Sequence, residues 1–278
     1  WQSEVQLECL VVTSRSDELR SALPSDKSRL RIVDAPAGLN WAQALNIGLQ
    51  NTRGDVVGAL SNRDVVRGEG LVHVRKAFEA NPEHKVAYGR AVYVDERCQF
   101  IRRFRSRPPT LTGLSKRPCL CSPSVFYLKE VLLQAGGFDD SLDFWANYDM
   151  WFRLVKKGYR FSEIPHEIAG VLQRELGTNP PQKVRDTEVR SCAEALQVVE
   201  RHTGSVGTRW PVRAGFAVAV AAGLHRNNIG FDKHVLSVAL KYTASSKRGL
   251  LPDSMYRSAI LAAHVKTECR VALRHPRV

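Results

Sequence analysis

The stretch GDVVGALSNRD, from Gly54 to Asp64, decides the fold prediction for this chain. It is a short apolar run that leads into a polar turn. Apolar runs of this length, bounded by turn residues, are typical of strands buried on both faces of a sheet. The turn ends in one carboxylate, Asp64. Three interpretations of this turn are therefore open: a metal site, a modified metal site or an ordinary turn.

Strand-like and helix-like segments alternate around this strand. Strands are expected at residues 7–12, 30–36 and 55–60, and helices at 40–54 and 68–83. Asn40 can cap the first helix and Gly54 can end it. Two strands joined by a turn at Asp95 and Glu96 are expected over 86–104. The alternation predicts an α/β fold with a mainly parallel sheet flanked by helices.

Ligands of such sheets bind beyond the carboxyl ends of the strands. The polar turns at Thr13 to Asp17 and at Ser61 to Asp64 both follow predicted strands. We therefore expect any ligand site at this edge of the sheet.

The last hundred residues have a different pattern. Helices are expected at residues 185–202, 214–225, 233–243 and 252–273. The segment GTNPPQ, from Gly177 to Gln182, has the composition of a linker. We therefore expect two parts, an α/β domain over 1–179 and a basic helical extension over 180–278.

The net charge of +13 is concentrated in the extension, where 16 Lys and Arg residues stand against 7 Asp and Glu. Such a segment suits an anionic partner: nucleic acid, a diphosphate-bearing substrate or an acidic membrane surface. The six cysteines form neither a zinc pattern nor a disulfide framework, which favours reduced thiols and a cytoplasmic setting. The apolar run from Ala214 to Leu224 is too short to span a bilayer but could lie in its interface. The first residue, Trp1, indicates a fragment or a processed product.

Three blocks of the chain, in this order, resemble family-2 glycosyltransferases, which have the GT-A fold. They are GLNWAQALNIGLQNTRGDVVGALSNRD, then VAYGRAVYVDERCQFIRRF, and then CSPSVFYLKEVLLQAGGFDDSLDFWANYDMWFRL. The resemblance runs from Leu7 to Gln173, and the family's first strand and helix have no counterpart before Leu7. It implies an enzyme that transfers sugar, with inversion, from a nucleotide-sugar donor to a saccharide or glycoconjugate acceptor.

This resemblance implies two acidic sites. At the strand end, carboxylates hold a divalent cation, Mg²⁺ or Mn²⁺, which stabilises the charge on the departing diphosphate. Across the cleft, a carboxylate removes the proton of the acceptor hydroxyl. The resemblance also assigns residues to nucleotide-sugar binding, namely Asp17, Gly38, Asn40, Asn46, Asn62, Arg63, Asp64 and Arg153.

The strand-end site departs from the family pattern. Ser61, Asn62 and Arg63 stand where the family has aspartates, and Asp64 is left as the one possible metal ligand. A guanidinium repels a cation but binds phosphate well, so Arg63 could contact the diphosphate directly. Alternatively Arg63 is an exposed turn residue and Asp64 caps the next element.

The second site departs as well. Asn147 stands at the position that resembles the catalytic acid, and an amide cannot act as a base. Asp149 is the remaining candidate base, but on a helix it points away from Asn147. It also stands four residues before Arg153, the spacing of a helix-surface ion pair.

Two other functions stay open from the sequence. Loss of the acidic residues suits a catalytically inactive scaffold or partner-binding domain. Binding of nucleic acid through the extension is disfavoured, because no recognised module is present. A further basic run consists of Arg102, Arg103, Arg105 and Arg107. These side chains could bind an anionic ligand or could simply be exposed to solvent. Localisation is expected to be cytoplasmic, and peripheral at the membrane if the extension binds lipid.

Overall fold

The computed structural model describes residues 6–22, 29–116, 118–173 and 182–207 of the 278. The strands are β1 (Cys9–Thr13), β2 (Leu30–Asp34), β3 (Val56–Gly58), β4 (Asp64–Val66), β5 (Val86–Val94), β6 (Phe100–Phe104), β7 (Val125–Leu128) and β8 (Phe161–Leu172). The helices are α1 (Ser16–Ala22), α2 (Trp41–Asn51), α3 (Gly70–Ala80), α4 (Leu111–Lys116), the 3₁₀ helix η1 (Ser122–Ser124), α5 (Lys129–Gln134), α6 (Ala146–Lys156) and α7 (Gln182–Gly207).

The chain divides into two compact units. One comprises residues 1–114 and 118–173, and the other comprises 115–117 and 174–278. The strands among the described residues belong to the first unit, and α7 belongs to the second. The predicted linker lies largely among residues 174–181, outside the described part of the chain.

The strands of the first unit form two sheets. β1 and β2 pair in parallel, and the other sheet has the order β3-β7-β5-β8-β4 with β6 added to β5. Within the larger sheet β5 and β8 are parallel, whereas the remaining pairs are antiparallel. The predicted α/β class with flanking helices is confirmed. The sheet is mixed, however, because hairpin-like returns such as β5–β6 add antiparallel strands to the parallel β5–β8 pair.

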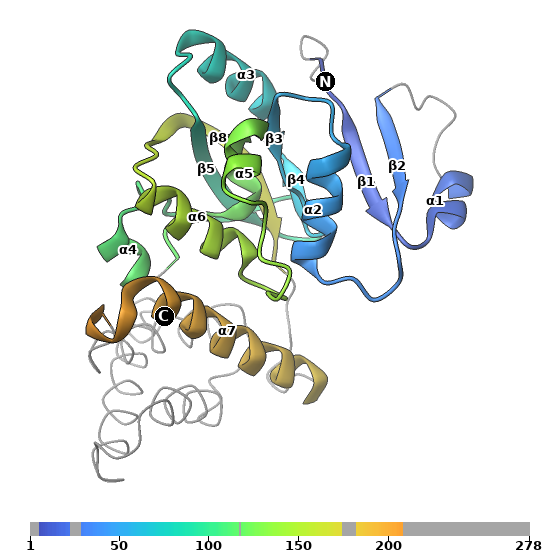
Figure 1. Cartoon of the computed structure of the whole chain (residues 1–278). Helices are drawn as coiled ribbons and strands as arrows, with labels where there is room; N and C mark the ends of the chain where they lie inside the picture. The colour runs from blue at the N-terminus through green and yellow to red at the C-terminus, as the bar shows by residue number, and fades with distance from the viewer. Residues whose placement is uncertain (1–5, 23–28, 117, 174–181, 208–278) are drawn as a thin grey trace, which may run out of the picture. The chain divides into compact units, whose positions relative to one another are not determined.

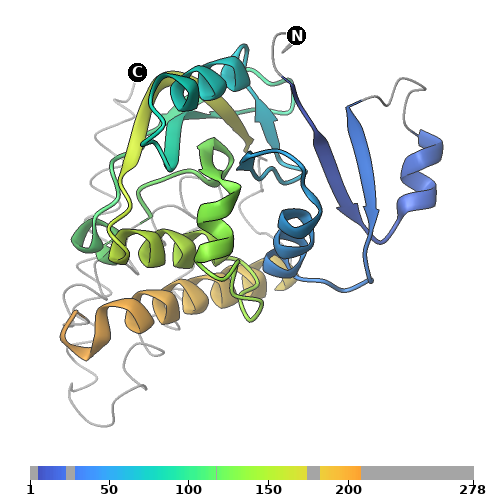
Figure 2. The ribbon, with the colours of Figure 1, turned by 45° about the horizontal axis from the view of Figure 1, so that its top comes forward.

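Successive residues of β7 show how the larger sheet is covered on both faces. Phe126 packs with Val74 of α3, whereas the hydroxyl of Tyr127 accepts a hydrogen bond from Trp151 Nε1 of α6 at 2.8 Å. Because side chains alternate along a strand, α3 and α6 cover opposite faces. Figures 1 and 2 show the same arrangement, with α2 and α5 on the α6 side.

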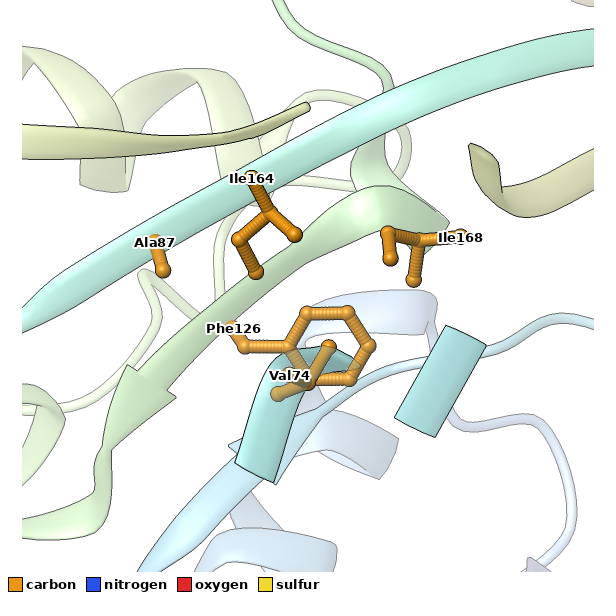
Figure 3. Close-up of a cluster of buried hydrophobic side chains, with 5 residues drawn as sticks. All are labelled: Val74, Ala87, Phe126, Ile164 and Ile168. Atoms are coloured by element: carbon orange, nitrogen blue, oxygen red, sulfur yellow. The ribbon is translucent and has the colours of Figure 1, made fainter. Parts of the chain in front are cut away.

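One group of buried side chains joins α3 to three strands. It consists of Val74, Ala87, Phe126, Ile164 and Ile168 (Figure 3). The backbone of β5 lies so close to β8 here that a Cβ on Gly89 would be 2.0 Å from Ile168 Cγ1. The register of the central parallel pair shifts beside this contact, between Gly89 and Ala91.

The structure agrees with most of the predicted elements. Helix α2 begins after Asn40, whose side chain accepts from Gln43 N at 2.9 Å while Gln43 Oε1 accepts from Asn40 N at 3.0 Å. It ends at Asn51, three residues before the predicted stop at Gly54. Helix α7 confirms the helix predicted at 185–202, and the other three predicted helices lie outside the described residues. None of the described helices is long and apolar enough to cross a membrane.

Replacing Gly89 by alanine should destabilise the domain by about 1–3 kcal/mol, because the new methyl group must displace a packed side chain. Urea unfolding of the full chain measures this. The matched control is Gly48→Ala in α2, where the new Cβ would be at an ordinary 3.7 Å from Val12. There alanine should add about 0.5–1 kcal/mol of stability. Equal stability of the two variants would contradict the packing at β5 and β8.

Candidate functional site

The polar turn at residues 61–64 connects the two outermost strands in the order of the larger sheet. Asp64 N donates to the Ser61 carbonyl at 3.1 Å and closes the turn. Asp64 also begins β4, a strand that the sequence did not predict, and it pairs with Val171 of β8. The turn is thus held from both sides by the sheet.

The carboxylate of Asp64 is tied into this turn. Its Oδ2 accepts hydrogen bonds from Ser61 N and Ser61 Oγ, both at 2.7 Å. Burial raises the pKa of Asp64, although the two bonds from Ser61 and the charge of Arg63 act in the opposite direction. Asp64 also contributes, after burial, to raising the pKa of Cys121 to about 12. The surroundings of Asp64 therefore disfavour its ionised form. Such shifts of pKa are common at functional sites.

Asn62 and Arg63 face solvent beside this carboxylate. Arg63 Nη2 donates to the Leu172 carbonyl at 3.3 Å, and the Arg63 carbonyl accepts from Leu172 N at 2.7 Å. A guanidinium has five N–H donors. Most of those of Arg63 therefore remain available to an anionic ligand.

The turn at residues 61–64 offers one carboxylate, Asp64, to a divalent cation. Its neighbouring side chains are a hydroxyl, an amide and a guanidinium, so Asp64 supplies one ligand oxygen beside a positive charge. Across the described residues, no group of three His, Cys, Asp or Glu side chains could hold a metal ion. Mg²⁺ is usually held by one or two carboxylates together with waters and substrate phosphates, so the turn by itself supplies only a small part of such a site.

Asn40 and Asn46 contact the third resemblance block instead of an open site. Asn46 Nδ2 donates to the Phe138 carbonyl at 2.8 Å and to Asp140 Oδ1 at 2.6 Å, and Asn46 Oδ1 accepts from Phe138 N at 2.8 Å. Asn40 Nδ2 donates to the Asp140 carbonyl at 2.7 Å. These amides fasten α2 to residues 135–140, which we call the Gly-Gly-Phe turn.

Arg153 fastens the same turn to α6. Its Nη1 donates to the Ala135 carbonyl at 2.7 Å, its Nη2 to the Gly137 carbonyl at 2.8 Å, and its Nε to Asp149 Oδ2 at 2.8 Å. Asp149 is almost fully buried. The expected Asp149–Arg153 pair therefore exists, but it lies inside the fold and not on the helix surface. The four-residue spacing in the sequence indicates the Asp149–Arg153 pair. The backbone carbonyls that Nη1 and Nη2 of Arg153 bind are known only from the fold.

The remaining predicted site residues stand apart from these networks. Asn147 is 6% exposed in the first turn of α6, and no hydrogen bond to its side chain is found among the described residues. Asp17 is exposed in the first turn of α1, on the connection between β1 and β2. Gly38 has a φ of 83°, which suits glycine, in the connection that leads to α2. No hydrogen bond or ion pair among the described residues joins Asp64 to Asn147.

Comparison with known proteins gives a distant relative with a stated role. The chain is 29% identical over 132 residues to the O-antigen biosynthesis protein RfbC of Myxococcus xanthus, covering 46% of this chain. The match spans 10% of the length of RfbC. No family model matches the sequence.

The solved structures that match are remote in sequence. The mannosyltransferase PcManGT from Pyrobaculum calidifontis, in complex with GDP-Man and Mn²⁺, matches with a TM-score of 0.49 and 17% identity over 94% of this chain and 77% of its own. TarS residues 1–349 from S. aureus, in complex with UDP, match with a TM-score of 0.47 and 14% identity over 88% and 85%. A mannosyltransferase is thus among the solved structures to which the chain is similar.

The Arg153 network predicts that Asp149→Asn destabilises the full chain by about 3–5 kcal/mol, because it leaves a partly buried guanidinium without its charge partner. Urea unfolding at neutral pH measures the loss. Glu79→Gln is the matched control. It breaks the Arg75–Glu79 pair, which has the same spacing on α3 but is exposed, and should change stability by no more than about 0.5 kcal/mol. Wild-type stability of Asp149→Asn would show that Asp149 has no structural role.

The raised pKa of Asp64 predicts a pH-dependent gain in Asp64→Asn. The ionised carboxylate costs stability above its folded-state pKa, and this cost disappears once the pH falls below the unfolded value of about 4. An asparagine oxygen can still accept from Ser61. Asp64→Asn should therefore be more stable than the wild type at neutral pH and equally stable in acid, as measured by urea unfolding at a series of pH values.

The control for this pH series is Asp55→Asn, which removes an exposed carboxylate and should leave stability unchanged. If Asp64→Asn were less stable than the wild type at every pH, the carboxylate would be a structural cap and not a group held at a cost.

Proposed function

We propose that the chain transfers a sugar from a nucleotide-sugar donor to a saccharide or glycoconjugate acceptor, with inversion at the anomeric carbon. The observation that carries this proposal is the turn at residues 61–64. There an exposed arginine and a carboxylate with a raised pKa lie on consecutive residues, in the block that resembles the donor site of glycosyltransferases. The similarity to an O-antigen biosynthesis protein supports a role in polysaccharide synthesis.

In this proposal Arg63 binds the diphosphate of the donor. When the glycosidic bond breaks, negative charge grows on the departing phosphate. A guanidinium can stabilise that charge through two parallel N–H···O bonds. Arg63 therefore performs the role that a metal-bound carboxylate cluster has in the family.

Asp64 has a different task, because a carboxylate repels a diphosphate. Its Oδ2 fixes the turn through Ser61, and no hydrogen bond to its Oδ1 is found among the described residues. We assign Oδ1 to a hydroxyl of the donor, since ionised carboxylates accept strong hydrogen bonds from hydroxyl groups. This assignment explains why an acid is kept where burial disfavours its charge.

Removal of the acceptor proton requires a base, and neither of the two candidate residues is well placed to act as one. Asn147 is an amide, and Asp149 is bound to Arg153 inside the fold. Asp149 would have to leave this ion pair to act as the base. The contacts therefore favour a second candidate function, a domain that binds the nucleotide sugar without transferring it and serves as a scaffold or partner module.

Titration calorimetry of the full chain with nucleoside diphosphates and nucleotide sugars tests the donor site. We expect binding that persists in the presence of a chelator, because Arg63 and not a cation contacts the phosphates. Arg63→Gln should weaken it about tenfold or more, which corresponds to one charge-assisted pair. Arg160→Gln, which removes another exposed arginine, should leave it unchanged.

Failure of every nucleotide to bind a folded chain would refute the donor site, and binding that a chelator abolishes would refute the role of Arg63. A transfer assay with labelled donor separates the two candidate functions. Transfer that is lost in Asp64→Ala would establish the enzyme, whereas binding without transfer would establish the inactive domain.

A further inference from the structure

The hairpin formed by β5 and β6 exposes two neighbouring large apolar side chains. Tyr93 pairs with Arg102 and Val94 pairs with Phe100, so Ile101 is an extra residue in the edge strand β6. Such a bulge interrupts the usual alternation of side chains between the two faces. Phe100 is 54% exposed and Ile101 is 41% exposed. The other large exposed apolar side chains in the described residues are single leucines, so these two form the one adjacent pair.

Four exposed arginines stand within seven positions of this apolar pair in the sequence, namely Arg97, Arg103, Arg105 and Arg107. The side chain of Arg103 is 76% exposed, although it lies 3.6 Å from Glu167. Arg102 differs from these four, because it lies 3.5 Å over the ring of Tyr93 and donates to Gln173 Oε1. The hairpin and the residues that follow it thus carry four exposed guanidinium groups besides Phe100 and Ile101.

Two acidic residues in the hairpin turn do not cancel this charge. Asp95 Oδ1 accepts from the backbone amides of Arg97 and Gln99, at 2.9 and 2.8 Å, so that oxygen is directed into the turn. Glu96 is exposed. Over residues 95–107, five arginines stand against these two acids.

We propose that the hairpin at residues 95–107 binds the surface of an anionic bilayer. Exposed aromatic and aliphatic side chains bordered by arginine are the composition of segments that insert shallowly among lipid headgroups. Arginines within a Debye length of an anionic surface add electrostatic attraction. The proposal does not rest on the donor site, because none of these residues belongs to the turn at 61–64.

Two other kinds of partner fit the same surface less well. A further β-strand could pair with the free edge of β6, but charged side chains and a bulge on an edge strand oppose such pairing. A nucleic acid would use the arginines but gain little from Ile101, and one aromatic side chain is a small stacking platform. The combination of an exposed apolar pair with four exposed arginines in one hairpin segment therefore favours lipid.

Co-sedimentation of the full chain with vesicles tests this proposal. We expect binding to vesicles made of equal parts phosphatidylcholine and phosphatidylglycerol, and much weaker binding to pure phosphatidylcholine. Each basic residue near an anionic surface raises partitioning about fivefold, so Arg103→Gln with Arg105→Gln should lower it more than tenfold. Phe100→Ser with Ile101→Ser should lower it several-fold at unchanged net charge.

Matched controls separate these effects from general changes of charge or apolar surface. Leu133→Ser removes another exposed apolar side chain, 50% exposed on α5, and Lys76→Gln with Lys156→Gln removes two exposed charges elsewhere. Both controls should bind like the wild type, and thermal melting should show that all variants fold.

The proposal is overturned if the hairpin variants bind vesicles as well as the wild type does, or if the wild type binds neither kind of vesicle. It is also overturned if the protein binds duplex DNA or RNA at physiological salt through the four arginines but does not bind the vesicles. Nucleoside diphosphate binding should be the same in the hairpin variants and the wild type, so failure of this proposal is distinguishable from failure of the donor site.

Discussion

The guanidinium group of Arg153 is the contact on which the packing of α6 against the Gly-Gly-Phe turn depends. One planar group donates to Asp149 on its own helix and to the Ala135 and Gly137 carbonyls of the Gly-Gly-Phe turn. Asn46 of α2 holds the same turn through the next residue, Phe138. Two helices that are far apart in sequence are thus joined through a short turn. Residues that resemble ligand-binding groups of glycosyltransferases here bind the protein's own backbone and side chains and hold the domain together.

The turn at residues 61–64 differs from this network in what its side chains leave free. Asn40, Asn46, Asp149 and Arg153 make most of their hydrogen bonds to the protein. Arg63, by contrast, directs one N–H to the protein and stands in solvent. Asp64 is held by Ser61 through one of its two oxygens, in a place where burial raises its pKa. These properties distinguish the turn from the network around Arg153, and an exposed guanidinium is suited to binding phosphate.

The sequence predicts the parts of the structure that depend on local pattern. The apolar runs of β1, β2 and β3 and the cap at Asn40 were all recognisable, because strands and caps have short-range signals. The strand β4 was not, since three residues give no periodicity and its pairing with β8 spans more than a hundred positions. The roles of Asn46 and Arg153 were also hidden. Residue identity indicates a polar group but not whether a ligand or the protein's own backbone will satisfy it, and only the tertiary contacts decide this.

Hydrogen–deuterium exchange of the full chain, with and without a nucleoside diphosphate, tests the central claim most directly. A ligand at the 61–64 turn should slow exchange of the backbone amides from Ser61 to Asp64 and of Leu172, which is hydrogen-bonded to Arg63. Exchange in the Gly-Gly-Phe turn should be unchanged, because the Phe138 amide is already bound by Asn46 and the amides of residues 135–137 are bound by carbonyls of α5. Slower exchange at residues 135–140 with no change at 61–64 would show that the donor binds elsewhere and would contradict the account.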